Sequence, residues 1–537
     1  MILRSSLAAA VAFGALAAAS SAHAQSADPA CDGLTALRLA NTRIDTAIAV
    51  KSGDRQPIEA FGLPSLTASA AYCRVSVTLT PVPGSEIHSE IWLPAPAAWN
   101  GKFAAMGNAG FGGALGPPRL SMRPALSRGY AVAGTDMGHT EAGADGKNAS
   151  WALNQPERII DFGHRANHVT AVAAKALVEA YYGRRPDRSY FQGCSDGGRE
   201  ALMAAQRYPD DFDGIVAGAP ANAWTHLMAS FAWSWKAAHQ SADSMLKAPN
   251  LARIQAAALA ACDDLDGVRD GVIEDPRICR FDPATIRCDV DATDGCLTAP
   301  QLDALKALYA GPRRGVTGAS LFPGFSPGGE AVRNGWDLWI TDAAAQQPDF
   351  ARSFFANFVF NDADWRLDQF DFDKDFDRAQ AAMAGILDSD NPDMSAFRAS
   401  GGKLLMYHGW SDAALPAEGT IRYFEAVRGA MGAEAVDDFA RLFMVPAMGH
   451  CFGGPGPNTF DMLGELDAWV EGAPAPERIV ASKYANDLAQ LLNMPAGQPQ
   501  STRPLCAYPK VARWKGEGAT TDEANFECVV QTPRAND

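Results

Sequence analysis

The most informative stretch of the chain is Ser189-Tyr190-Phe191-Gln192-Gly193-Cys194-Ser195-Asp196-Gly197-Gly198. Its first four residues predict a short buried strand, and the residues from Gly197 through Tyr208 predict a helix. Between them, Gly193 to Gly197 fit the pattern Gly-x-Ser-x-Gly. In this setting the pattern predicts a strained turn that presents Ser195, with glycines where strand and helix approach each other. A turn of small residues without any chemistry is the alternative.

Strand-like and helix-like segments alternate on both sides of this turn. Apolar residues recur three and four positions apart from Arg165 to Tyr182, which indicates a helix. The alternation predicts βαβ units and an α/β fold with a mostly parallel sheet. The expected strands are Glu86–Leu93, Lys102–Met106, Tyr130–Thr135, Ser189–Gln192, Gly214–Ala217, Lys403–Tyr407 and Arg441–Val445.

The pattern changes between residues 220 and 400. Strand signals fade there, while six of the 12 tryptophans and four of the 10 cysteines fall in or beside this block. A block of this length between two strands of one sheet predicts a large inserted domain. We expect it beyond the carboxyl ends of the strands, where such sheets bind ligands. Residues 25–219 and 401–537 would then form the two parts of one α/β domain.

A nucleophilic serine needs a base, and the base needs a carboxylate that orients it. Asp412 follows the expected strand Lys403–Tyr407, and His450 follows Arg441–Val445. The order serine, aspartate, histidine, each just after a strand, predicts an α/β-hydrolase fold with Ser195, Asp412 and His450 as the triad. His408 and His139 are weaker candidates for the base, and a loop histidine without a catalytic role is the alternative.

Backbone N–H groups would stabilise the oxyanion of such a reaction. We expect one from Asp196, directly after the nucleophile. The other should come from the glycine-rich loop of residues 107–113, where Gly110 is favoured and Ala109 is nearly as good a candidate. A nucleotide-binding function of this loop is disfavoured, because it lacks both the Gly-x-Gly-x-x-Gly spacing and a following P-loop lysine.

The N-terminus predicts export. Within Met1–Ala24, Arg4 precedes an apolar run from Leu7 to Ala19, and Ala22-His23-Ala24 forms a small-x-small cleavage site. A membrane anchor is the alternative, but the run is shorter than the roughly 20 residues that a spanning helix needs. We therefore expect a signal peptide at residues 1–24, cleaved near Ala24, and a secreted or periplasmic product.

The cysteine count agrees with export, because an even number in an exported chain predicts disulfides. Sequence alone does not fix the connectivity, but spacing and position favour four pairs and leave Cys194 and Cys451 as the fifth. A triad would also bring these two cysteines together, because they flank Ser195 and His450. A zinc site is disfavoured by the absence of Cys-x-x-Cys. The four favoured pairs are Cys31–Cys73, Cys262–Cys279, Cys288–Cys296 and Cys506–Cys528.

An acidic loop in the insertion is a candidate metal site. Asp263, Asp266 and Asp270 bring three carboxylates into a compact segment to which backbone carbonyls could be added. Hard oxygen ligands suit Ca²⁺, although the spacing is not that of an EF-hand. A solvated acidic turn is the alternative.

Composition narrows the function classes. The 537 residues are 47% hydrophobic and 20% charged, which is typical of a globular protein. The formal net charge of −16 disfavours a nucleic-acid binder, and after the N-terminal run no segment is long and apolar enough to span a membrane.

Three motifs together resemble one family. They are Gly193–Gly198, His408-Gly409-Trp410-Ser411-Asp412 and Gly449-His450-Cys451. They are similar to the tannase and feruloyl esterase family of α/β-hydrolases, which includes mono(2-hydroxyethyl) terephthalate hydrolases. The cysteines beside the serine and the histidine are the most specific part of this resemblance.

The resemblance implies the triad, the disulfide Cys194–Cys451, and a lid formed by residues 220–400. It also implies structural Ca²⁺ held by Asp263, Asp266 and Asp270 with the backbone oxygens of Val268 and Val272. The expected function is that of a secreted serine carboxylesterase acting on small esters of hydroxycinnamic, gallic or related aromatic acids. The alternatives are a terephthalate monoester hydrolase or other carboxylesterase, a peptidase or polyester hydrolase, and a non-catalytic carbohydrate- or polyphenol-binding protein.

Substrate contacts are harder to predict, because the insertion would supply them. Arg352 could pair with the free carboxylate of a terephthalate monoester, and Leu415 could form a pocket wall. The aromatic residues of the insertion could stack on an aryl ring or could equally form its core. Besides the tryptophans, these are Phe354, Phe355, Phe358 and Phe360.

Overall fold

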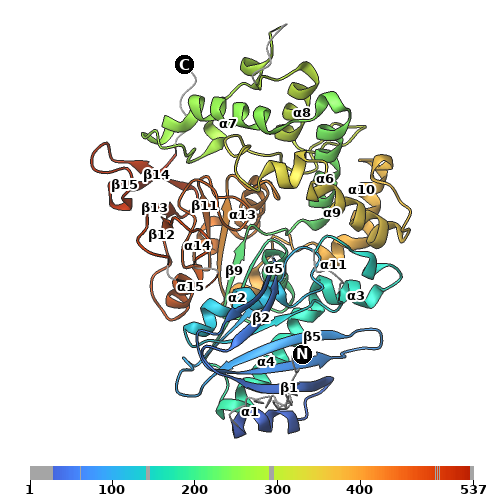
Figure 1. The fold of residues 1–537 in the computed structure, drawn as a ribbon, viewed down its shortest axis with the longest axis vertical. Coiled ribbons are helices and arrows are strands. Elements are labelled where there is room, and N and C mark those ends of the chain that lie inside the picture. The colour runs from blue at the N-terminus through green and yellow to red at the C-terminus, as the bar shows by residue number, and fades with distance from the viewer. Residues whose placement is uncertain are drawn as a thin grey trace, which may run out of the picture.

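The computed structural model describes residues 28–531 apart from residues 61, 141–145, 290–294, 490, 491, 493 and 495. The expected signal peptide at residues 1–24 lies outside the described residues. A nine-stranded sheet crosses the lower and middle part of the molecule in Figure 1, with helices packed on it.

The central sheet has the strand order β1-β4-β5-β7-β6-β8-β9-β10-β11. The six strands from β7 to β11 in this order pair in parallel, whereas β1, β4 and β5 form an antiparallel edge. All seven expected strands are present. The bounds are β1 Thr42–Val50, β4 Tyr72–Leu79, β5 Ile87–Pro94, β6 Lys102–Met106, β7 Ala131–Thr135, β8 Arg188–Cys194, β9 Gly214–Gly218, β10 Lys403–Gly409 and β11 Ala440–Val445.

Helices cover both faces of this sheet. Neighbouring strand residues point to opposite faces, so Phe191 belongs to one hydrophobic cluster and Tyr190 to another. The first cluster lies under α4, α5 and α13, and the second under α2 and α15. These helices are α2 Gly116–Ser127, α4 Ala166–Tyr182, α5 Asp196–Arg207, α13 Glu418–Met431 and α15 Met462–Val470.

The long segment between β9 and β10 leaves and re-enters the sheet at adjacent strands. Its described residues form helices and no strand, and part of it has a hydrophobic cluster of its own around Trp336. In Figure 1, α7 and α8 lie at the opposite end of the molecule from β1. The helices are α6 Trp224–His239, α7 Ala248–Cys262, α8 Ala299–Ala310, α9 Gln346–Phe354, α10 Lys374–Ala379, α11 Gly385–Leu387 and α12 Ser395–Ala399.

The chain ends in two small antiparallel sheets beside the main one. They pair β12 (Arg478–Lys483) with β13 (Ser501–Cys506) and β14 (Lys510–Trp514) with β15 (Phe526–Val530). A third small sheet pairs β2 (Arg55–Ala60) with β3 (Leu63–Thr67).

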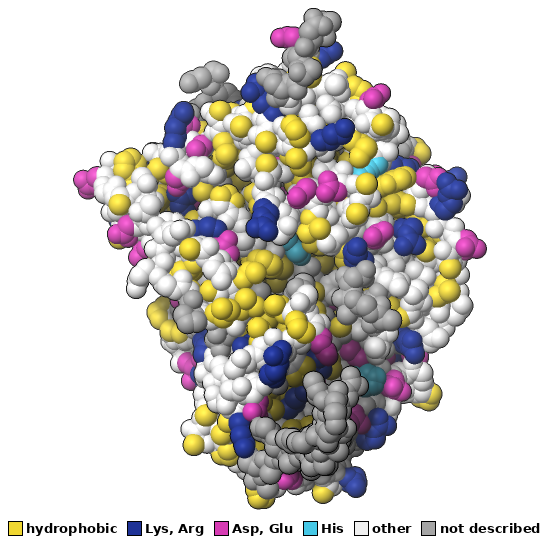
Figure 2. Space-filling view, viewed as in Figure 1, with side chains coloured by type: hydrophobic (Ala, Val, Ile, Leu, Met, Phe, Trp, Pro, Cys, Tyr) yellow, Lys and Arg dark blue, Asp and Glu magenta, His cyan; other side chains and the backbone are white. Residues whose placement is uncertain are grey.

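All five expected disulfides are present, including Cys194–Cys451. Charged side chains of both signs are scattered over the face in Figure 2. None of the helices in the described part of the chain combines the length and apolar character that a bilayer crossing requires.

Candidate active site

Ser195 occupies the turn between β8 and α5, as expected. Its backbone angles are φ 66° and ψ −123°, a conformation that residues with side chains rarely adopt. A Cβ atom on Gly193 would lie 2.2 Å from the carbonyl oxygen of Gly197, and one on Gly198 would lie 2.4 Å from that of Gly218. Glycine is therefore required on both sides of the serine, and the turn presents Ser195 at the carboxyl end of the parallel strands.

Asp412 follows β10 and is buried among hydrogen-bond donors. Its Oδ1 accepts the backbone N–H groups of Ala414 and Leu415 at 2.8 and 2.9 Å. Its Oδ2 lies 2.7 Å from Nδ1 of His450 and 3.1 Å from Nε2 of His408. Burial disfavours the charged form, but the charge of His450 and the hydrogen bonds from both histidines outweigh it and hold the pKa of Asp412 well below its usual value. Asp412 is therefore ionised at neutral pH.

His408 is a second, buried histidine on the same carboxylate. Its Nδ1 lies 2.7 Å from the hydroxyl oxygen of Thr420. Because Nε2 donates to Asp412, the neutral ring accepts the Thr420 hydroxyl proton at Nδ1, and this network assigns the tautomer. Both nitrogens of His408 are thus engaged, whereas His450 uses only Nδ1 in the hydrogen bonds of the described residues.

His139, the other weaker candidate for the base, has no carboxylate partner among the residues that the structure describes. Its ring is 3% exposed and stacks on Trp151 at 3.6 Å between centroids. Neither ring nitrogen has a hydrogen-bond partner in the described residues, and burial lowers the pKa of His139 to about 3. The geometry of a base held by a carboxylate is found at His450.

The disulfide Cys194–Cys451 joins the residue before Ser195 to the residue after His450. It places the two Cα atoms 6.0 Å apart, although 257 positions separate them in sequence. The serine turn and the histidine loop are therefore held together covalently.

The backbone N–H groups of Asp196, which follows Ser195, and of Gly110 donate no hydrogen bond to the described residues. Gly110 has φ 58°, and a Cβ atom on it would lie 2.4 Å from the carbonyl oxygen of Gly146. The competing candidate, Ala109, donates its N–H to Oδ1 of Asn108 at 2.8 Å. The loop is fixed to α5 by the N–H of Gly197, which donates to the Asn108 carbonyl at 3.1 Å. This arrangement favours Gly110 over Ala109 as a free donor.

Aromatic rings of the insertion approach the histidine. The half-buried ring of Trp339 lies 5.3 Å from that of His450, edge to face, and stacks on Phe350 at 6.2 Å. The four phenylalanines singled out in the sequence lie elsewhere: Phe354, Phe355 and Phe358 are buried in the core, and Phe360 stacks on Trp365.

The two residues suggested for substrate binding differ in position. Leu415 is 5% exposed, and its backbone binds Asp412. Arg352 is exposed on α9 and has no hydrogen bond or ion pair within the described residues. The structure therefore brings Leu415, but not Arg352, into contact with the Ser195, Asp412 and His450 group.

The acidic loop follows α7 and packs against the C-terminal strands. The carboxylate of Asp263 accepts the N–H groups of Asp270, Gly271 and Val272 at 3.0 to 3.2 Å. Arg503 of β13 lies 2.6 Å from Asp270 and 3.4 Å from Asp266. Among the residues that the structure describes, no group of three or more His, Cys, Asp or Glu side chains is arranged to hold a metal ion.

The donor set of this loop nevertheless suits a hard cation. Oδ2 of Asp266 is buried without a hydrogen bond, and burial raises the pKa of Asp266 to about 6 despite the charge of Arg503. Three carboxylates pair with this one arginine, because Glu274 also lies 3.3 Å from it. An additional positive charge would compensate the excess of negative charge on these carboxylates.

Comparisons with known proteins identify a matching family and several relatives. A family model described as tannase and feruloyl esterase matches residues 73–529. An uncharacterized esterase of Xanthomonas campestris is 42% identical over 95% of this chain and 92% of its own. A mono(2-hydroxyethyl) terephthalate hydrolase of Piscinibacter sakaiensis is 35% identical over 86% of each chain. The crystal structure of feruloyl esterase B from Aspergillus oryzae superposes with a TM-score of 0.84 at 28% identity, covering 93% of this chain and 99% of that one.

Proposed function

The chain belongs to the tannase and feruloyl esterase family and is a carboxylic ester hydrolase; from this we propose that it cleaves esters of aromatic acids with Ser195 as the nucleophile. The observation that carries the proposal is the 2.7 Å contact between Asp412 and Nδ1 of His450, on a loop tied by a disulfide to the serine turn.

In the proposed reaction, Ser195 Oγ attacks the ester carbonyl carbon while Nε2 of His450 takes the hydroxyl proton. Asp412 holds the imidazole by its Nδ1 and stabilises the positive charge that develops there. The N–H groups of Asp196 and Gly110 stabilise the oxyanion. His450 returns the proton to the departing alcohol, which leaves an acyl-enzyme. Water, deprotonated by His450, then attacks the acyl carbonyl; the bond to Ser195 Oγ breaks, His450 returns the proton to Oγ, and the acid is released.

We assign the aromatic character of the acid from two supports. The relatives include a feruloyl esterase and a terephthalate monoester hydrolase by name. In this chain, the half-buried ring of Trp339 stands beside His450, where it could contact an aryl group. Esters of hydroxycinnamic or gallic acid are the first choice, with Leu415 as a candidate pocket wall.

Hydrolysis of a terephthalate monoester is the second candidate, favoured by the 35% identity to the Piscinibacter hydrolase. It would require a cation for the free carboxylate. Arg352 is the residue that we propose for this role, and because the side chain is exposed on α9, it would have to turn toward the site.

We further propose that Ca²⁺ stabilises the acidic loop. Asp263, Asp266 and Asp270, with the carbonyl oxygens of Val268 and Val272, would hold it. When bound, the ion would neutralise the carboxylates of the loop that follows α7 and packs against β13 and β14. The five disulfides are consistent with an extracellular or periplasmic protein, and we infer that residues 1–24 direct the export.

The test is hydrolysis of a matched panel by the purified protein and by S195A. The panel contains methyl ferulate, methyl gallate, chlorogenate, mono(2-hydroxyethyl) terephthalate and a short p-nitrophenyl ester. We expect selective turnover of one aromatic ester by the wild type and none by S195A, with an unchanged melting temperature. R352A should lose activity only on the terephthalate monoester.

Each other outcome has a definite meaning. Turnover by S195A would refute the nucleophile. Cleavage of the p-nitrophenyl ester alone would retain the triad and refute the aromatic acyl group. Cleavage of peptides but not of aryl esters would favour a peptidase. Failure of a serine-directed phosphonate to label the wild type would favour a non-catalytic binding protein.

A further inference from the structure

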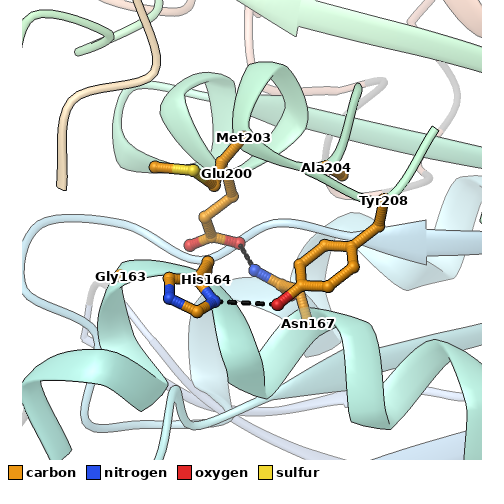
Figure 3. Close-up of a pocket in the computed structure, with 7 residues that line it drawn as sticks. All are labelled: Gly163, His164, Asn167, Glu200, Met203, Ala204 and Tyr208. Atoms are coloured by element: carbon orange, nitrogen blue, oxygen red, sulfur yellow. Dashed lines mark hydrogen bonds between the residues drawn. The ribbon is translucent and has the colours of Figure 1, made fainter. Parts of the chain in front are cut away.

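Helix α5 carries a buried glutamate that the proposed mechanism does not use. Glu200 lies one turn beyond Asp196, and its residue is 2% exposed. Figure 3 shows its carboxyl group extending from α5 toward Asn167 and His164 of the neighbouring helical segment. A fully buried carboxyl group is costly unless it is paired or neutral, so its contacts indicate its role.

Glu200 binds the glycine-rich loop directly. Both of its carboxyl oxygens lie 3.2 Å from the backbone nitrogen of Asn108, whose N–H they share. Nδ2 of Asn167 on α4 donates to Oε2 at 2.9 Å. The Asn108 carbonyl accepts the N–H of Gly197, two residues after the nucleophile. The loop that contains Gly110 is therefore attached to α5 through both the backbone N–H and the backbone carbonyl of Asn108.

The same carboxyl group stands beside Asp196. Asp196 is ion-paired with Arg199 through Oδ1 at 2.6 Å, and its buried Oδ2 lacks a conventional donor among the described residues. Burial, then the charge of Asp196 and a hydrogen bond with it, raise the pKa of Glu200 well above its usual value. A proton kept by Glu200 gives the Asp196 side chain a hydrogen-bond donor, and Oδ2 of Asp196 has no other donor among the described residues.

The other groups that face Glu200 do not supply a compensating charge. His164 and Tyr208 hydrogen-bond to each other at 2.8 Å across a cavity of about 10 Å³, room for about one water (Figure 3). Burial and the neighbouring arginines lower the pKa of His164 to about 4, so its ring is neutral near pH 7. Arg199 is the one cation of this group and is already paired with Asp196.

We propose that Glu200, as a neutral carboxylic acid, is a positioning residue that fixes the two N–H donors of the oxyanion hole relative to each other. It accepts from the loop that carries Gly110 and donates to the side chain of Asp196. This inference rests on the proposed function, because it assumes that Asp196 and Gly110 stabilise an oxyanion. Glu200 itself does not contact the substrate.

The experiment compares E200A, E200Q and the wild type on the best ester of the panel. E200A removes both contacts, so it should lower kcat about 10- to 100-fold with little change in KM, because oxyanion donors act on the transition state. Gln keeps an acceptor for Asn108 and a donor for Asp196, so E200Q should recover most of the lost kcat. E179Q, which changes an exposed glutamate on α4, is the matched control.

A second measurement does not depend on turnover. At neutral pH, the infrared carbonyl band of buried protonated carboxyl groups should be weaker in E200Q than in the wild type, by the contribution of one group. The proposal is overturned if E200A keeps the wild-type kcat, if E200Q loses as much as E200A, or if the band is the same in both proteins. If E200A fails to fold, the kcat of E200Q and the infrared band still test the proposed role of Glu200. Activity in S195A would instead refute the proposed function, so the two failures are distinguishable.

Discussion

Asp412 accepts four hydrogen bonds, two from backbone N–H groups and two from histidines. Four donors fill the usual capacity of a carboxylate, which is why this fully buried group stays charged. Thr420 orients His408, His408 and the two N–H groups orient Asp412, and Asp412 orients His450. The direction of the proposed base is thus set by residues from β10, α13 and the loop between them.

H408A should lower both stability and kcat. It removes one donor from a buried carboxylate, which costs about 1–3 kcal/mol in the free energy of unfolding. It also lets the Asp412 side chain rotate, so kcat should fall while KM stays similar. H168A is the matched control, because His168 is a half-exposed histidine that pairs with Asp211 outside the site. Thermal unfolding and steady-state kinetics of both variants test this prediction. Equal losses of stability and kcat in H408A and H168A would contradict a specific role of His408.

Some polar residues of the site can be predicted from the sequence, and others cannot. Ser195, Asp412 and His450 are predicted as site residues because each follows a strand or lies in a distinctive motif. Glu200 and Thr420 lie within helices, where a polar residue usually faces solvent. The one available signal was the composition of residues 196–207, whose small and apolar residues indicate a helix buried on most sides. A glutamate there must be paired or neutral, but its partners come from other segments.

At the scale of elements, Asp388 joins the two ends of the insertion to each other. Its carboxylate accepts the Thr225 backbone N–H at 2.9 Å and the Thr225 hydroxyl at 2.7 Å, at the start of α6. Burial raises the pKa of Asp388 to about 7. The pKa of an unfolded aspartate is about 3.9. Between about pH 4 and pH 7 the folded protein therefore binds a proton that the unfolded chain releases.

Stability should accordingly fall as the pH rises through this window, and D388N should reduce that fall. Asparagine can accept from the Thr225 N–H and donate to its hydroxyl, so the contacts persist without a charge. Melting temperatures measured at several pH values between about 4 and 8 test this. D393N, at an exposed position of the same segment, is the control and should keep the wild-type slope. An identical slope in D388N would contradict the role of Asp388.

The strands that were predicted are those buried by helices on both faces. Their apolar runs are nearly continuous, and their observed ends lie within two residues of those expected. The sheet edge was not predicted, because β1 is half-exposed and mixes Arg43 and Asp45 with apolar residues. The short strands β12 to β15 were also missed. They form two-stranded sheets outside the central one, and β13 and β14 contact the insertion through Arg503 and the N–H of Ala512.

At the scale of the whole molecule, Cys194–Cys451 should matter for activity more than the other disulfides. Its 257-residue separation gives a loop-closure contribution of about 5 kcal/mol, against about 2–3 kcal/mol for the 8-residue separation of Cys288–Cys296. The double variant C194S/C451S should lose most of its kcat and melt at a lower temperature. C288S/C296S should keep its kcat. Wild-type kcat in C194S/C451S would show that the disulfide does not position the site.

Removal of Ca²⁺ should destabilise the protein without changing the reacting groups. We expect a lower melting temperature after dialysis against EGTA, restored by Ca²⁺ but not by Mg²⁺, which requires a tighter octahedral geometry. D263N should melt at the lower temperature with or without Ca²⁺. Elemental analysis of the purified protein checks the stoichiometry. The calcium site would be refuted if the purified protein contains no calcium and its melting temperature does not change after dialysis against EGTA.

The position of the disulfide Cys194–Cys451 has a consequence for proteolysis. The covalent ring that it closes contains α6 to α12 and the strands β9, β10 and β11. One cut by a protease anywhere in the insertion opens this ring but leaves both pieces joined through sulfur. A nicked molecule would therefore migrate as one band in a non-reducing gel and as two after reduction. Ser195 and His450 would therefore stay covalently tethered after the first cut.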